Sequence, residues 1–187
     1  MLKKETRILG IEDAPFDKFK KGNVLIIGTI FRGGLWLDGV LSTKVKVDGN
    51  NSTAKLVQMI NKSKFKPQIQ CILIDGIAFG GFNIIDIGKL NKKTKIPVMV
   101  IIRKYPDFKK IKETLNTLNK SNKYKLIEKA GDINKINKIY VQIKGADLSF
   151  AKDILRISCT RSLIPEPLRA AHIIASGVVD GESRGGA

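Results

Sequence analysis

The chain has 187 residues, of which 43% are hydrophobic and 27% are charged, as in an ordinary globular protein with one core. No apolar run reaches the ~18 residues that a membrane-spanning helix needs, and the start of the chain lacks the apolar core of a signal peptide, so we expect a cytoplasmic protein with no membrane partner. The net charge of +17 favours a nucleic-acid partner, although lysine-rich composition also occurs in thermophiles.

The first half of the chain is rich in strand patterns. Apolar or alternating runs predict three consecutive strands, at residues 7–13, 23–34 and 35–47. The pair Gly33-Gly34 is typical of a hairpin turn between the second and third strands. A helix is expected next, because apolar residues recur at helical spacing over residues 52–63.

The second half alternates helices and strands. We expect buried strands at 68–74 and 98–102, helices at 82–94, 107–121, 145–157 and 165–179, and short edge strands at 124–130 and 138–143. Gly177 is expected to end the last helix, and residues 180–187 read as a flexible tail. Antiparallel strands that lead into βα units predict a mixed α/β sheet with helices on both faces in a single domain, residues 1–187. A ribonuclease H-like architecture has this order, and a distorted Rossmann-like domain is the alternative.

Acidic residues stand where three of these strands end. Glu12 and Asp13 end the first strand, Asp48 follows the third, and Asp75 ends the buried strand CILI. Phosphodiester hydrolysis with Mg²⁺ or Mn²⁺ needs several carboxylates that converge on the metal. We therefore expect a metal site built from Glu12 or Asp13 together with Asp48 and Asp75. The alternative is that acids before glycine, as at Asp48 and Asp75, are ordinary turn residues.

Basic residues are candidates for contacts to phosphate. Arg103 and Lys104 follow the strand at 98–102, where they can reach a phosphate oxygen, or they can lie in an exposed loop. Arg161, Glu166 and Arg169 lie near the start of the last helix, and a helix N-terminus attracts anions.

Further candidates lie in less specific contexts. Arg32 stands between Phe31 and Trp36, which can stack on bases or pack in the hairpin. His172 is the single histidine, and we expect it to be a packed residue of the last helix. The two cysteines, Cys71 and Cys159, lack metal-ligand spacing and are expected to be reduced thiols.

Four segments together resemble a known family. They are ILGIEDAPF, FRGGLWLDGVLSTKVKVDG, ILIDGIAFGGFNIIDI and RSLIPEPLRAAHIIASGVVDGESRGGA. They look like the largely archaeal family catalogued as domain of unknown function ninety-nine, which is similar to endonuclease V. That resemblance implies a ribonuclease H-like nuclease that uses Mg²⁺ and acts on deaminated, inosine-containing DNA or RNA.

The resemblance assigns roles residue by residue. Glu12, with Asp13 beside it, stands where endonuclease V has its first metal-binding Asp, and Asp48 is the nearest match to its second acid. Asp75 with Gly76 matches its Asp-Gly pair, and Arg103 or Lys104 corresponds to its lysine. The aromatic-Ile-Pro wedge and the Gly-His-Arg segment of that family are absent. The function expected is a metal-dependent endonuclease, and the alternative is a nucleic-acid or nucleotide-binding protein that has lost catalysis. Short edge strands leave a dimer open.

Overall fold

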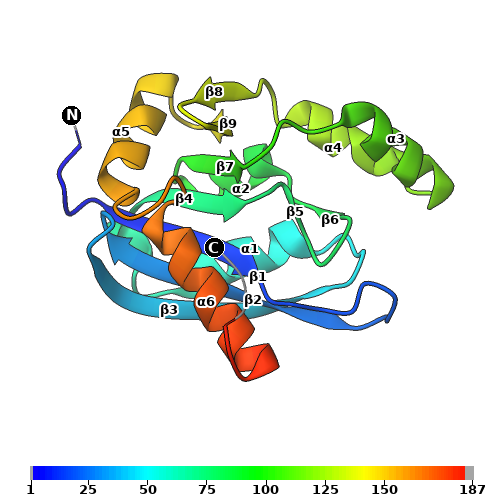
Figure 1. Ribbon diagram of the computed structural model, residues 1–187, viewed down its shortest axis with the longest axis horizontal. Coiled ribbons are helices and arrows are strands. Elements are labelled where there is room, and N and C mark those ends of the chain that lie inside the picture. The colour runs from blue at the N-terminus through cyan, green and yellow to red at the C-terminus, as the bar shows by residue number, and fades with distance from the viewer. Residues whose placement is uncertain (1, 184–187) are drawn as a thin grey trace.

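A mixed seven-stranded sheet forms the centre of the molecule (Figure 1). The computed structural model describes residues 2–183. The strand order is β3-β2-β1-β4-β7-β9-β8, and the mixed α/β sheet predicted from the sequence is confirmed. Among residues 2–183, no helix is long and apolar enough to cross a membrane.

The first three strands form an antiparallel meander, as predicted. They are β1 (Arg7–Asp13), β2 (Asn23–Arg32) and β3 (Trp36–Lys46). Gly33 turns the hairpin between β2 and β3 with a positive φ of 55°, which costs glycine little. The strand β3 lies at the edge of the sheet.

The centre of the sheet is parallel. The strands β4 (Ile69–Asp75) and β7 (Val98–Ile102) run parallel to β1, so the carboxyl ends of all three lie at one edge. The far side is completed by β9 (Ile139–Lys144), antiparallel to β7, and by the short edge strand β8 (Asn134–Ile136). A small separate hairpin joins β5 (Ala78–Phe79) and β6 (Asn83–Ile84).

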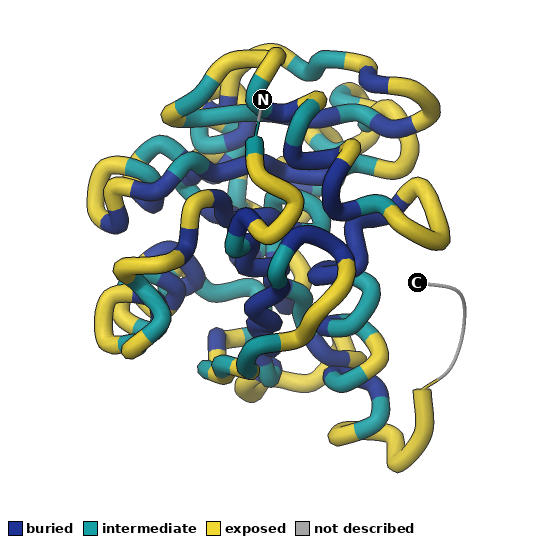
Figure 2. Tube along the Cα trace, turned by 90° about the vertical axis from the view of Figure 1, so that its left-hand side faces the viewer, coloured by how far each residue is buried: buried dark blue, intermediate teal, exposed yellow. Residues whose placement is uncertain are grey.

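Helices cover both faces of the sheet. One face packs against α1 (Ser52–Lys62) and α2 (Ile87–Thr94) through an apolar cluster that includes Leu9, Ile11 and Ile74. The other face packs against α5 (Leu148–Ser158) and α6 (Glu166–Asp180). In Figure 1, α6 crosses in front of the N-terminal strands, and α5 stands at the upper left. In Figure 2, buried segments concentrate in the interior of the molecule, and exposed segments lie mostly at its periphery.

A smaller helical unit lies beyond the carboxyl ends of the strands. It consists of α3 (Phe108–Thr117), α4 (Tyr124–Lys129) and the 3₁₀ turn Ser121–Lys123, packed with the β5–β6 hairpin. A second 3₁₀ turn, Lys66–Gln68, precedes β4. Asp107 caps α3 by accepting a hydrogen bond from the Lys110 N–H at 3.0 Å.

Three sequence expectations were wrong in detail. Residues 124–129 form the helix α4 and not an edge strand, because Tyr124, Leu126 and Ile127 pack together on the apolar side of α3. The helix expected at 82–94 begins only at Ile87, after the β6 strand. The last helix runs through Gly177 to Asp180 and is followed by Gly181 with a φ of 81°. Asp180 therefore belongs to the helix, and of the tail expected at 180–187, residues 184–187 lie outside the described part of the chain.

Candidate functional site

Strand alternation places one side chain from each parallel strand end on the same face of the sheet. Ile11 pairs with Ile74, and Asp75 pairs with Ile101, so the three strands end in register. Successive side chains of a strand point to opposite faces. The face covered by α5 and α6 therefore receives three series that each end in a polar residue: Ile8-Gly10-Glu12, Cys71-Leu73-Asp75 and Met99-Ile101-Arg103.

Glu12 and Asp75 form the centre of this site. The charge of each carboxyl group acts on the other, and their side chains are only 12% and 14% exposed. Burial, followed by the charge of Asp75, raises the pKa of Glu12 to about 10. The Oε2 atom of Glu12 is buried and has no hydrogen-bond partner among the described residues. Two buried carboxyl groups with an unpartnered oxygen form an environment that a cation would stabilise.

Arg103 supplies a positive charge at the edge of the pair. Its Nη2 atom donates to Asp75 Oδ2 at 2.8 Å, and its side chain is 41% exposed. The guanidinium therefore bridges the carboxylate pair and solvent, where it can also contact a phosphate oxygen. Of the two basic residues expected at this strand end, Arg103 makes the contact with the acid, and Lys104 is an exposed neighbour.

The helix α6 approaches β1 closely enough to bring a histidine to the pair. Gly10 permits this, because a Cβ atom there would collide with the backbone of Pro167. The buried hydroxyl of Thr29 donates to the Pro167 carbonyl oxygen at 2.6 Å and fixes the same turn of the helix. His172, one and a half turns further along, places its Nδ1 atom 3.6 Å from Glu12 Oε1.

His172 is thus a site residue that sequence reasoning did not select. One sequence feature could have indicated it: His172 follows Arg169 by three residues on a helix that begins with the acid Glu166. Glu166 is buried, accepts from Arg169 Nε at 2.8 Å, and keeps an unpartnered Oε1 within the described structure. Arg169 therefore pairs with its own helix, which differs from the open phosphate contact that we expected from it.

The other two acids point elsewhere. Asp13 follows Glu12 and faces the opposite side of the sheet, where its Oδ2 atom accepts from the Gly80 N–H at 2.7 Å. Burial raises the pKa of Asp13, and the bond from Gly80 opposes this shift.

Asp48 is a turn residue with a φ of 53°. Its Oδ1 atom accepts from the Phe82 N–H at 2.8 Å, and its Oδ2 atom pairs with Lys120 Nζ at 2.9 Å. Burial would raise the pKa of Asp48, but the Phe82 N–H and the Lys120 ammonium outweigh it and lower that pKa. The expected convergence of Glu12, Asp48 and Asp75 therefore does not form, and residues 2–183 contain no group of three or more His, Cys, Asp or Glu side chains placed to hold a metal ion.

A buried lysine that the sequence did not single out holds the Asp48 turn. The Nζ atom of Lys123 donates to the carbonyl oxygens of Asp48, Gly49 and Phe82 at 2.7–2.8 Å. Burial, with the charge of Lys120, lowers the pKa of Lys123. These bonds tie the α3–α4 unit to the turn after β3, which is a structural role.

The remaining sequence candidates lie apart from the carboxylate pair. Arg32 donates from Nε to both carboxylate oxygens of Asp38, at the opposite end of β1 from Glu12. Phe31 is part of the core at 8% exposure, whereas Trp36 is 62% exposed. Arg161 lies exposed in the loop between α5 and α6. Cys71 and Cys159 form no disulfide, as expected.

Solved structures place the fold in a known class. The endonuclease V of Bacillus subtilis superposes with a TM-score of 0.63 at 11% identity, covering 94% of this chain and 81% of that one. Ciona intestinalis endonuclease V, in complex with DNA that contains an inosine, gives 0.56 at 15% identity, covering 89% and 82%. The fold is therefore that of the ribonuclease H-like endonucleases V.

Sequence comparison gives the family. Residues 4–179 match the model of the family described as endonuclease dU, and the chain belongs to that family. A UPF0215 protein of Methanothermobacter thermautotrophicus is 50% identical, covering 100% of this chain and 94% of its own. A crystal structure of an Archaeoglobus fulgidus protein of unknown function has a TM-score of 0.86 at 37% identity, covering 92% and 98%.

Proposed function

We propose that this protein is a metal-dependent endonuclease that hydrolyses phosphodiester bonds next to deaminated bases. The observation that carries the proposal is the buried pair of Glu12 and Asp75, with its unpartnered Glu12 oxygen and raised pKa. Carboxyl groups are kept together in this costly arrangement where function requires it. The family match and the endonuclease V fold give independent support for nuclease chemistry.

Glu12 and Asp75 are the proposed metal ligands. Mg²⁺ is commonly held by one or two carboxylates, with water and substrate phosphate completing its shell, so a two-carboxylate site fits this metal without Asp48. A bound Mg²⁺ or Mn²⁺ would supply activation of the attacking water and stabilisation of the leaving oxygen. Arg103, already at 2.8 Å from Asp75, orients the phosphate and offsets its developing charge. His172 lies where it can hold or transfer a proton at Glu12 Oε1.

The proposed substrate is a nucleic acid with a deaminated base. The matching family is described as endonuclease dU, and the Ciona neighbour was crystallised with inosine-containing DNA. Deoxyuridine and inosine are both products of base deamination. The net charge of +17 favours association with the phosphate backbone. We therefore propose DNA that contains deoxyuridine as the first substrate to test, with inosine-containing DNA and RNA beside it.

Loss of catalysis, the alternative, is disfavoured by the intact pair. A protein that only binds nucleic acid has no use for two carboxyl groups whose burial and mutual repulsion raise the pKa of one of them. Glu12 stands where endonuclease V has its first metal-binding aspartate. This difference leaves the pair intact, because the Glu12 side chain interacts with Asp75.

A cleavage assay tests the proposal. Oligonucleotides with one deoxyuridine, one inosine or neither are incubated with the purified protein and Mn²⁺, Mg²⁺ or EDTA. We expect metal-dependent cleavage of a deaminated strand, reduced at least about 100-fold by Asp75→Asn and by Glu12→Gln. Asp17→Asn is the matched control, because Asp17 is an exposed acid whose carboxylate contacts only its near neighbours in the chain, the Phe19 N–H and Lys20, among the described residues. Cleavage that survives Asp75→Asn, or no cleavage of any strand, would contradict the proposal.

A further inference from the structure

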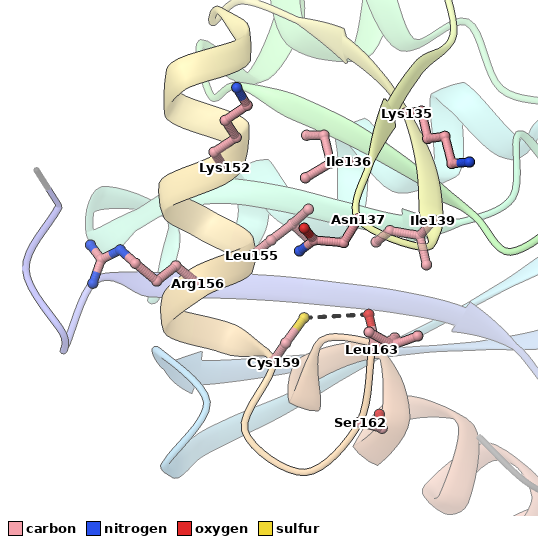
Figure 3. Close-up of a pocket in the computed structure, with 10 residues that line it drawn as sticks. All are labelled: Lys135, Ile136, Asn137, Ile139, Lys152, Leu155, Arg156, Cys159, Ser162 and Leu163. Atoms are coloured by element: carbon pink, nitrogen blue, oxygen red, sulfur yellow. Dashed lines mark hydrogen bonds between the residues drawn. The ribbon is translucent and has the colours of Figure 1, made fainter.

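A pocket of about 580 Å³ lies between α5, the β8–β9 hairpin and the loop that joins α5 to α6 (Figure 3). Ile136 and Asn137 of the hairpin and Leu155 of α5 project into the same space. Cys159 and Leu163 close its lower end, where the Cys159 Sγ donates to the Leu163 carbonyl oxygen at 3.4 Å. This volume lies within the range of small-molecule sites, about 300–1,000 Å³.

The lining combines an apolar floor with a cationic rim. Ile136, Ile139 and Leu155 are nearly fully buried and form the floor. Lys152 of α5 lines one side, and no acidic residue lines this pocket in the described structure. Lys135 lines the hairpin side, where its side chain points away from α5 and its Nζ atom lies 5.9 Å from the centroid of the Tyr140 ring. Arg156 also lines the pocket but is paired with Asp153 at 3.2 Å, so the two lysines set the charge of the rim. A flat apolar group that is attached to a negative charge matches such a site.

The pocket lies on the same face of the sheet as the carboxylate pair. Ile139 and Leu155 belong to the cluster that also buries Ile8 and Leu73 beneath α5 and α6. Tyr140 pairs with Ile102 in the antiparallel ladder. Ile139 is therefore next to the end of β7, from which Arg103 extends. The β8–β9 hairpin, which forms one side of the pocket, thus lies beside the edge of the sheet that carries the proposed catalytic residues.

We propose that this pocket receives the base of one unpaired nucleotide of the substrate strand, near the cleaved bond, while Lys135 and Lys152 contact its phosphates. The inference rests on the proposed nuclease function and names a subsite for it. A nucleobase has the flat apolar faces that Ile136, Ile139 and Leu155 can contact, and Asn137 adds an amide at the rim. A base must leave the stack to enter, so the protein prefers single-stranded or locally unpaired nucleic acid.

An abasic scan tests the base contact directly. Single-stranded substrates are made with one abasic site moved stepwise to either side of the cleaved bond. We expect one position at which loss of the base lowers kcat/KM about tenfold, in line with the stacking of one base. The variant Leu163→Trp fills the pocket from a side chain that is 47% exposed. In that variant the base-containing strand should be cleaved about tenfold more slowly, with no further loss from the abasic site.

Leu118→Trp is the matched control, because Leu118 is 41% exposed at the end of α3 and does not line this pocket. It should reproduce the position-specific loss of the wild type. If no position shows the loss, or if the same loss persists in Leu163→Trp, the pocket is not the base site. Cleavage by the wild type in that case leaves the nuclease proposal standing.

Charge reversal tests the phosphate contacts. Lys135→Glu with Lys152→Glu should weaken binding of a single-stranded oligonucleotide at least tenfold at low salt and reduce the slope of log K against log salt by about 1.4. Lys55→Glu with Lys109→Glu makes the same change in net charge at exposed positions that do not line this pocket, and should leave the slope within about 0.5. Equal effects of the two double variants would show that Lys135 and Lys152 make no specific contact with the phosphates.

Cys159 reports occupancy without any need for cleavage. It lines the pocket, whereas Cys71 is fully buried, so alkylation of the native protein modifies Cys159. A saturating oligonucleotide should slow that modification more than fivefold in the wild type and less than twofold in the Lys135→Glu, Lys152→Glu variant. An unchanged rate in the wild type overturns the pocket proposal. Protection in a protein that cleaves nothing would instead support the pocket and contradict the nuclease assignment.

Discussion

Glu12 and Asp75 end two neighbouring parallel strands in the same register, and their carboxyl groups meet on the face of the sheet beneath α6. The meeting follows from pairing alone, because Ile11 lies beside Ile74 and the next residue of each strand turns to the same face. Repulsion and burial make this pair costly in the protein without a metal.

Glu12→Gln should stabilise the metal-free protein above neutral pH. Burial and the charge of Asp75 raise the pKa of Glu12 from 4.5 to about 10 in the folded state. Between those values the folded protein holds a proton that the unfolded chain releases, so the free energy of unfolding falls as pH rises. Glutamine removes this dependence. We expect a gain of about 1–2 kcal/mol at pH 8, or several degrees in Tm, measured in EDTA.

The same scan at low pH is the control. Below about pH 4.5 both states of Glu12 are protonated, so the two proteins should unfold at nearly equal temperatures there. A wild-type Tm that rises relative to Glu12→Gln between pH 6 and 9 would contradict the raised pKa.

Divalent cations should stabilise the wild type more strongly as pH rises. Binding at Glu12 and Asp75 must displace the proton that Glu12 holds, so a higher pH favours the metal. We expect millimolar Mn²⁺ to raise Tm by several degrees at pH 8.5 and by less at pH 6.5, and EDTA to reverse both shifts. Asp75→Asn should abolish the shift.

Asp48→Asn distinguishes a metal site made of Glu12 and Asp75 alone from one that also includes Asp48. Asp48 contacts the Phe82 N–H and Lys120 and does not meet the pair, so its variant should keep the Mn²⁺ shift while losing stability. If Asp48→Asn abolishes the shift and Asp75→Asn does not, the ligands have been assigned wrongly.

Much of this arrangement could be anticipated from the chain, for definite reasons. The strands β1, β4 and β7 have apolar runs long enough to show where each strand ends and to which face of the sheet each residue points. The positions of Glu12, Asp75 and Arg103 were therefore predictable. Asp48 was not, because its direction depends on a left-handed turn and on Lys120, which lies far along the chain.

Short or distant elements account for the other misses. Residues 124–129 are too few for periodicity to separate helix from strand, and their packing against α3 decides the outcome. His172 reaches Glu12 only because α6 packs onto β1 at Gly10, a contact between segments with no local signal.

Lys123→Ala should destabilise the fold without removing the pair of Glu12 and Asp75. The Lys123 ammonium donates to three carbonyl oxygens, two of them in the Asp48–Gly49 turn. Its loss leaves these acceptors without their donor and opens a cavity. We expect the free energy of unfolding, measured in urea, to fall by about 2–4 kcal/mol. Lys125→Ala, at an exposed position two residues on, should cost less than about 0.5 kcal/mol; equal losses in the two variants would show that the three bonds contribute little.

Gly10→Ala should separate α6 from the site. The added Cβ would meet the backbone of Pro167 and lie 2.7 Å from the Leu168 nitrogen, and the buried backbone of a helix start cannot yield as a flexible side chain does. We expect α6 to shift outward, which moves His172 away from Glu12 and lowers both stability, by about 2–3 kcal/mol, and cleavage, by more than tenfold. Urea unfolding and single-turnover kinetics measure the two effects.

Gly22→Ala is the control for glycine replacement itself. A Cβ at Gly22 meets no atom within 4 Å, so this change should be nearly neutral or slightly stabilising. A Gly10→Ala protein that folds with unchanged stability and cleaves at the wild-type rate would show that the approach of α6 to β1 does not set the distance between His172 and Glu12. If its stability falls but its cleavage rate per folded molecule does not, His172 is a packing residue, as first expected from the sequence, and takes no part in proton transfer.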